Sequence, residues 1–187
     1  MRFSENRVIA WIVLAVCVIG SIVGLGGAGM ARERNEVVEV YFEGADDRDS
    51  AHCMQAYVDR AFENARIMAK EVQLNLSAED VYAAAALEVL EAHNPASDED
   101  FFSVGAACKE LRELSDDLYN EMYAANLPDD RRVNFKMAYD DFWGAMKLIE
   151  KDPYLELAED FNDKREASFV SELVCLIRGV DRLWESF

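Results

Sequence analysis

The longest apolar stretch of the chain lies near its N-terminus, at residues 8–30. It contains no charged side chain, and Ser21 is its only polar one. A helix of about 18 or more apolar residues can cross a hydrocarbon core of about 30 Å, whereas a helix of a soluble protein normally keeps a polar face. The pattern therefore predicts a single transmembrane helix, and we assign residues 1–31 to an N-terminal anchor.

A cleaved signal peptide is the alternative interpretation of the same stretch. Arg2 and Arg7 form a short basic region that suits either interpretation, and Gly29-Met30-Ala31 resembles a small-x-small cleavage site. The apolar core of a signal peptide usually spans about 7–15 residues, which is shorter than this one. Length therefore favours an uncleaved signal-anchor, with the N-terminus inside the cell and most of the chain outside the cytoplasm.

Beyond residue 31, apolar positions recur at steps of three and four, which is the period of an α-helix with one buried face. No segment alternates convincingly between apolar and polar residues, and glycine and proline are scarce. The sequence predicts an all-α protein in which residues 32–187 form an antiparallel helical bundle with a four-helix-type core. Helices are expected over residues 31–43, 50–74, 77–93, 97–125, 130–149, 153–161 and 165–178.

The expected helix ends carry recognisable capping residues. Ser50, Ser77 and Ser97 are candidate N-caps, the last two with acidic residues in the following turn. Pro153 is well placed as the first residue of a helix, and Gly179 as the residue that ends one.

The period also predicts which side chains are buried. The helix over 97–125 has the most regular stripe, and the last helix is expected to bury Phe169, Leu173, Leu176 and Ile177. The other expected core positions are Met54, Tyr57, Val58, Ala61, Phe62, Ala65, Met68, Val72, Phe101, Val104, Cys108, Leu111, Ser115, Leu118, Met122, Ala125, Phe135, Tyr139, Phe142, Met146, Ile149, Tyr154, Leu157, Ala158 and Phe161.

The last third of the chain carries an aromatic pattern with a known counterpart. Tyr154 and Phe161-Asn162 are seven residues apart, Phe169-Val170 follows, and Gly179-Val180 closes the segment. This pattern resembles the LemA family of bacterial membrane-anchored helical proteins, as does an anchor that leads directly into a long helix, with Arg60 in an early extramembrane helix. The resemblance implies a membrane-tethered antiparallel helical bundle and brings no catalytic residues.

The chain departs from the family pattern at three points. Leu155 stands where the family has its first asparagine, Val170 replaces a proline, and eight residues separate Phe161 from Phe169. Read without the resemblance, Tyr154, Phe161 and Phe169 are core side chains at near-heptad spacing. Asn162 is expected to fix the register by bonding the backbone of a neighbouring helix.

The charge of the chain is strongly acidic. Its formal net charge is −18, and Arg2, Glu5 and Arg7 give residues 1–31 a charge of +1, so residues 32–187 carry −19. This charge argues against nucleic acid as a partner and against binding driven by an anionic lipid surface, because both favour basic patches. The acidic residues are expected to form a solvated surface, or else a face that docks a basic partner or divalent cations.

The residues that could carry chemistry show no recognised arrangement. The four cysteines, Cys17, Cys53, Cys108 and Cys175, have no metal-ligand spacing. His52 and His93 are the only histidines, and neighbours in sequence such as His52 and Cys53 point in different directions on a helix. The adjacent acids Asp46/Asp47, Asp116/Asp117 and Asp140/Asp141 do not predict a converging site. The sequence gives no candidate for a catalytic, cofactor-binding or metal-binding residue.

These observations predict a non-enzymatic, membrane-anchored helical bundle that binds a protein partner or organises the cell envelope. The alternatives are an enzyme or metal-binding bundle whose site assembles only in the fold, and a secreted helical domain after signal cleavage. Gly20, Gly24 and Gly27 resemble a Gly-x-x-x-Gly motif, through which two membrane helices can associate as a homo-oligomer.

Overall fold

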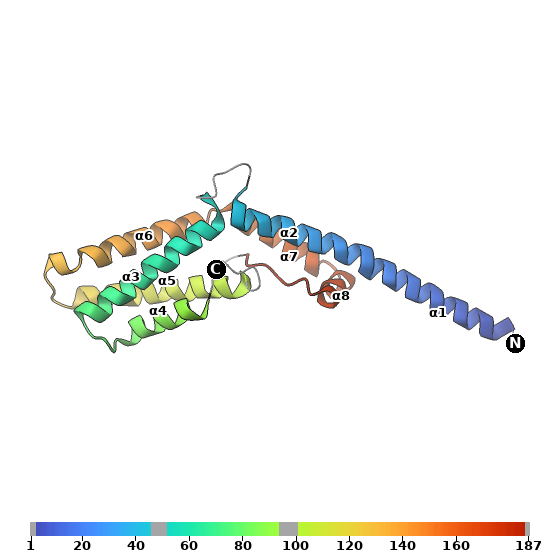
Figure 1. Ribbon diagram of the computed structural model, residues 1–187, viewed down its shortest axis with the longest axis horizontal. Coiled ribbons are helices and arrows are strands. Elements are labelled where there is room, and N and C mark those ends of the chain that lie inside the picture. The colour runs from blue at the N-terminus through green and yellow to red at the C-terminus, as the bar shows by residue number, and fades with distance from the viewer. Residues whose placement is uncertain (1–2, 46–51, 94–100, 186–187) are drawn as a thin grey trace.

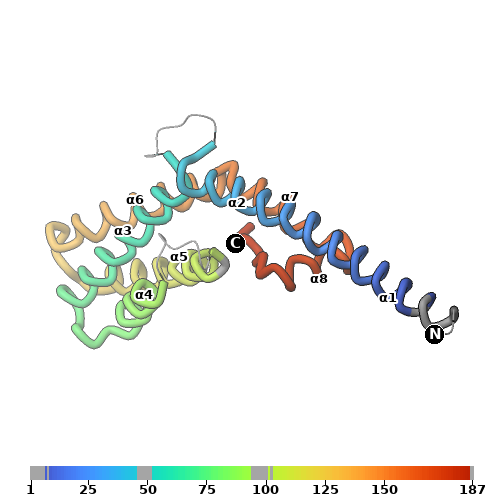
Figure 2. The backbone as a smooth tube through the Cα atoms, turned by 45° about the vertical axis from the view of Figure 1, so that its right-hand side comes forward, coloured from blue at the N-terminus to red at the C-terminus, as the bar shows by residue number. Residues whose placement is uncertain are grey.

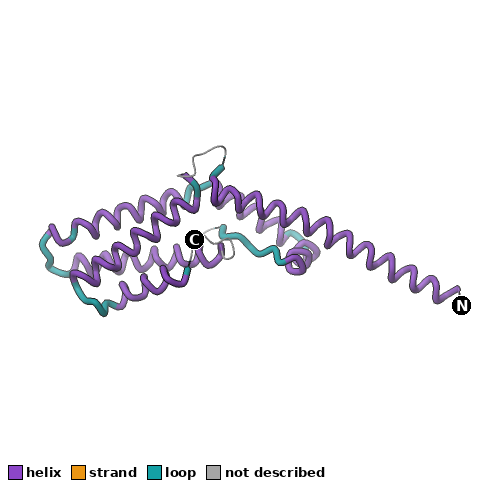
Figure 3. Tube along the Cα trace, in the orientation of Figure 1, coloured by secondary structure: helices purple, strands orange, loops and turns teal. Residues whose placement is uncertain are grey.

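The computed structural model describes residues 3–45, 52–93 and 101–185, and every regular element in these ranges is helical (Figure 3). The all-α prediction is therefore confirmed for the described residues. In chain order the elements are α1 (Phe3–Ser21), a π-helical turn (Ile22–Gly26), α2 (Gly27–Glu43), α3 (Met54–Asn75), α4 (Val81–Ala92), α5 (Phe101–Ala124), a 3-10 turn (Asp129–Arg131), α6 (Val133–Ile149), α7 (Pro153–Glu166) and α8 (Phe169–Arg178).

The first three elements form one continuous helix, which we call the long helix. Its α1 part extends away from the rest of the protein, whereas α2 packs against other helices (Figure 1). By length and composition it is the one described helix that could cross a membrane, and none of its most apolar window is buried within the protein. An apolar helix that packs against nothing in its own chain needs another apolar environment.

The remaining helices form two groups. In the head, α3 packs against α4, α5 and α6; in the neck, α2 packs against α7 and α8. From the end of α2 the chain runs into the head along α3, and after α4 and α5 it returns towards α2 along α6. Beyond α6, α7 begins at Pro153 and lies beside α2 (Figures 1 and 2). The structure thus pairs α3 with α6 in the head and α2 with α7 in the neck.

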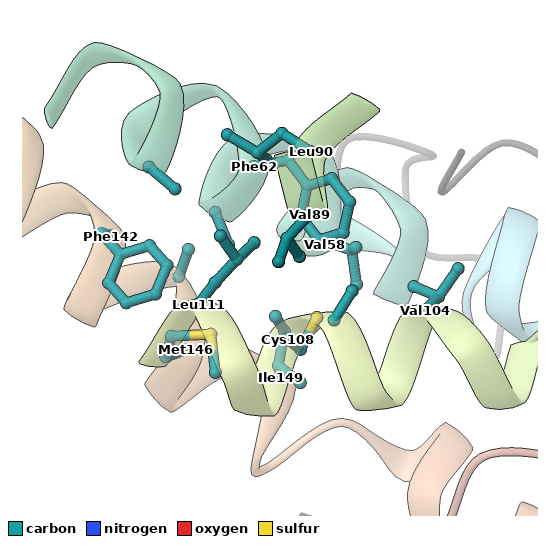
Figure 4. Close-up of a cluster of buried hydrophobic side chains, with 14 of the residues drawn as sticks. Val58, Phe62, Val89, Leu90, Val104, Cys108, Leu111, Phe142, Met146 and Ile149 are labelled. Atoms are coloured by element: carbon teal, nitrogen blue, oxygen red, sulfur yellow. The ribbon is translucent and has the colours of Figure 1, made fainter. Parts of the chain in front are cut away.

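The core of the head consists of apolar side chains from all four of its helices (Figure 4). Among those drawn, Val58 and Phe62 come from α3, Cys108 and Leu111 from α5, and Phe142 from α6. Each is at most 4% exposed. The expected stripes of α3, α5 and α6 are buried except at three positions that are only half-buried, which are Tyr57, Ala125 and Tyr139.

An aromatic cluster joins the head to the neck. The ring of Tyr41 at the end of α2 lies 4.8 Å from that of Phe101 at the start of α5 and 5.2 Å from that of Tyr154 at the start of α7. Both contacts are edge-on, which aromatic pairs favour. Burial raises the pKa of both tyrosines far above the ordinary value. The long helix is therefore anchored in the core where head and neck meet.

Several helix ends follow the sequence and others differ: α7 runs on to Glu166 and α8 begins only at Phe169. Asp152 caps α7 by accepting from the Tyr154 N–H at 2.9 Å, with Pro153 as the first helical residue as predicted. The prediction that Ser77 caps α4 is wrong, because Asp80 accepts from the Ala83 N–H at 2.8 Å and α4 begins after it. The predicted caps at Ser50 and Ser97 lie outside the described residues.

Candidate functional site

The candidate site lies where α8 crosses the long helix at the π-helical turn. A π-helical turn displaces backbone carbonyls from the regular hydrogen-bonding pattern, and such turns are frequent at functional positions. Arg178 at the end of α8 uses two of these carbonyls. Its Nε donates to the Val23 oxygen at 3.3 Å and its Nη2 to the Gly24 oxygen at 3.2 Å. The two segments are more than 150 residues apart in sequence.

The close approach of α8 depends on the absence of a side chain at Gly27. A Cβ at this position would lie 2.6 Å from Cγ of Arg178 and 3.2 Å from Cγ1 of Val174. Gly20 and Gly24 have no comparable neighbour, because no heavy atom lies within 4 Å of a Cβ placed there. Of the three glycines in the predicted helix-association motif, Gly27 is therefore covered by the chain's own α8.

The prediction for the buried face of the last helix is wrong. Phe169, Leu173, Leu176 and Ile177 are all exposed, and α8 instead buries Val174 and Cys175. Ser168 caps α8 by accepting from the Ser171 N–H at 3.1 Å, so α8 is a short separate helix that does not continue from α7. Gly179 ends it with φ of +65°, as predicted.

The chain after α8 is held against the neck by Asn162 of α7. The Asn162 amide donates to the Leu183 carbonyl at 2.7 Å, and its oxygen accepts from the Leu183 N–H at 3.0 Å. Asn162 bonds a backbone as expected, but the prediction that this backbone belongs to a neighbouring helix is wrong, because Leu183 lies in the C-terminal tail. The next residue, Trp184, is 3% exposed and lies over Gly105 of α5.

Carboxylates near the junction are paired with cations. Lys164 of α7 pairs with Glu33 of α2, and Arg32 pairs with Glu36 at 2.9 Å. In the head, the carboxyl of Glu121 forms a hydrogen bond with that of Asp80, and this bond, together with burial and the charge of Asp80, raises its pKa to about 7. Glu33 and Glu36 of the neck are therefore each paired with a cation, whereas Glu121 in the head faces another carboxyl.

The residues considered for catalysis do not assemble into a reaction centre. His52 is exposed while Cys53 beside it is 2% exposed. Burial raises the pKa of the Cys108 thiol to about 12, which opposes formation of a thiolate. No disulfide joins any of the four cysteines, all of which are described. Among the described residues, no group of three histidine, cysteine, aspartate or glutamate side chains could hold a metal ion.

The adjacent acids are engaged in ordinary surface contacts. Asp116 of α5 accepts from the Tyr139 hydroxyl at 3.1 Å, and Asp140 of α6 pairs with Lys136 one turn away. Asp46 and Asp47 lie outside the described residues.

No protein-family model, curated protein or solved structure matches the chain. At the positions that carry the resemblance to the LemA family, Tyr154, Phe161 and Asn162 are buried, whereas Phe169 is 77% exposed.

Proposed function

We propose that the protein is a membrane-anchored, non-enzymatic helical bundle of LemA-like architecture that acts through protein–protein contacts, as a binding or scaffolding protein of the cell envelope. The observation that carries the proposal is the long helix. None of its most apolar window is buried by the described residues, while its C-terminal part is built into the core through Val37 and Tyr41.

The long helix combines an exposed apolar segment with a segment packed in the neck, and this combination fits an anchor better than a signal peptide. Its helical geometry continues from the apolar segment into α2 without a loop, and α8 packs across the join. Cleavage after Gly29 or Ala31 would remove Gly27 and the carbonyls of Val23 and Gly24, which are the contacts that hold Arg178 and Val174. An uncleaved chain retains them.

The proposal of an interaction role rests on the acidity of the chain beyond the anchor, in head and neck together. Residues 32–187 carry a formal charge of −19, the balance of −18 for the chain and +1 for its first 31 residues. A surface of this charge steers basic partners towards it and repels acidic ones.

Membrane fractionation of the full chain, tagged at Phe187 and expressed in bacteria, tests the anchor. We expect the protein to resist extraction by alkaline carbonate. One arginine at a helix centre opposes membrane insertion by about 2.5–3.5 kcal/mol, so the double variant Leu14→Arg, Val18→Arg should leave the membrane fraction. The matched control places arginine at two exposed residues of the head, Leu74 and Val133, and should remain membrane-bound.

Protease treatment of spheroplasts tests the orientation. We expect external protease to remove the tag and degrade the head, and an intact N-terminus at Met1 in the purified protein. Protection of the head would place it in the cytoplasm, and a mature N-terminus near Arg32 would indicate a secreted domain. Stoichiometric metal in the purified chain would support the enzyme or metal-binding alternative.

A further inference from the structure

One face of α8 is apolar and exposed. Its members are Phe169, Val170, Leu173, Leu176 and Ile177, which are 77%, 51%, 41%, 73% and 57% exposed. At 3.6 residues per turn these five side chains fall within one third of the helix circumference. Contiguous apolar patches are uncommon on soluble proteins and mark surfaces that meet another protein or a membrane.

The direction of this face follows from the residues opposite to it. Cys175 is fully buried and belongs to the same core cluster as Val180 and Leu183. On the helical wheel Cys175 points almost directly away from the centre of the exposed face. The apolar face of α8 is therefore turned away from the core cluster that joins neck and head.

The position of α8 along the long helix matches the end of a membrane span. Arg178 is bonded to Val23 and Gly24. The helix from Arg7 to Gly24 measures about 27 Å at 1.5 Å per residue, close to the hydrocarbon thickness of about 30 Å. The exposed apolar side chains of the long helix, such as Ile19 and Ile22, lie directly before the level at which α8 crosses it.

We propose that α8 lies in the membrane–water interface, with its exposed apolar face among the lipid acyl chains and Arg178 at the level of the headgroups. The inference rests on the proposed membrane anchor. It extends that proposal by assigning the chain a second membrane contact and by fixing the depth of the span, because the π-helical turn then marks the membrane surface.

The binding energy of this contact comes from apolar burial and tethering. Interfacial helices usually carry several basic residues on the polar face, whereas α8 has Arg178 and the acidic Glu172. The long helix holds α8 at the surface, so its insertion is an intramolecular step that needs no electrostatic attraction. The strong acidity of the chain is therefore compatible with this contact.

Nitroxide labels on the full chain in phosphatidylcholine nanodiscs test the proposal. Single cysteines replace Leu176, Val13 and Leu74 in a Cys17→Ala background, in which the other native cysteines are buried. Leu74 is the matched control, because it is a helical leucine with 77% exposure, against 73% for Leu176, and lies at the end of α3 in the head. The measurement is the ratio of label accessibility to oxygen, which concentrates in lipid, and to a water-soluble nickel complex.

We expect the ratio at Leu176 to approach that at Val13 and to exceed that at Leu74 several-fold. A second label at Phe169 should give the same result. If Val13 reports lipid but Leu176 reports water, the interfacial helix is refuted and the anchor stands. If Leu176 is shielded from both reagents, a second copy or another protein covers α8, and the proposal is likewise refuted. If Val13 itself reports water, the proposed anchor fails as well.

Discussion

Gly105 of α5 offers a sharp test of how the C-terminal tail packs on the head. The indole ring of Trp184 lies directly over it, so that a Cβ at this position would come within 2.3 Å of Cδ1 and 2.4 Å of Cγ. The ring is rigid, and the preceding residue Leu183 forms two hydrogen bonds with Asn162, donating in one and accepting in the other. The Trp184 ring can make room for an alanine at position 105 only if the C-terminal tail moves with it.

The size of the effect follows from two opposing contributions. Overpacking a filled site destabilises by about 1–3 kcal/mol, while replacing glycine by alanine inside a helix stabilises by about 1 kcal/mol. We expect Gly105→Ala to lower the free energy of unfolding by up to about 2 kcal/mol, which is a decrease in Tm of up to about 8 °C for a chain of this size. Gly144 of α6 is the matched control, because no heavy atom lies within 4 Å of a Cβ there.

Thermal and urea unfolding of the full chain in detergent, followed by circular dichroism, measures both variants. Gly144→Ala should stabilise by about 0.5–1 kcal/mol. In a Trp184→Ala background the obstacle is absent, so Gly105→Ala should change sign and stabilise by a similar amount, giving a large coupling energy in the double-mutant cycle. Stabilisation by Gly105→Ala in the wild-type background would refute the packing of Trp184 described above.

Three further predictions concern single side chains. Glu121→Gln should stabilise the folded protein by about 1 kcal/mol above pH 7, because the raised pKa of Glu121 makes ionisation of its carboxyl unfavourable in the folded state, although solvent screens part of the repulsion. The gain in stability over the wild type should grow from pH 4.5, the ordinary pKa, to about pH 7. A gain that does not change with pH would contradict the raised pKa. Asn162→Ala should destabilise by about 2–4 kcal/mol in urea unfolding, because the buried backbone groups of Leu183 lose both partners. Asn64→Ala is the control, because the Asn64 amide bonds only the Arg60 carbonyl of its own helix, and it should change stability by less than about 0.5 kcal/mol. Cys108 should react with a maleimide at pH 8 only after unfolding, and rapid modification of the native protein would show that the core opens.

Much of the fold could be predicted from the sequence, because residues repeating at three and four positions report one buried side of a helix. The stripe that begins at Phe101 and the one that begins at Met54 are buried as expected. Pro153 and Gly179 also mark helix ends correctly, since each has a backbone preference that few other residues share.

The junction at α8 could not be predicted, for a physical reason. The helix carries two apolar arcs, one with Val174 and Cys175 and a wider one with Phe169 and Leu176. Periodicity gives the angle between the two arcs but does not tell which of them packs against the rest of the protein. The prediction that the wider arc is buried is therefore wrong. The only local signal for the contact was Gly27, whose role depends on a side chain more than 140 residues away.

The length of α2 has an electrostatic consequence once the apolar segment lies in a bilayer. Its 17 residues, from Gly27 to Glu43, rise by about 25 Å, which is about three Debye lengths at physiological ionic strength. The two carboxylates nearest the membrane that form ion pairs, Glu33 and Glu36, are matched by Lys164 and Arg32. Salt therefore screens the negative charges of the head from an anionic lipid surface, whereas a molecule in the aqueous phase can approach the head to within a Debye length and meet its field.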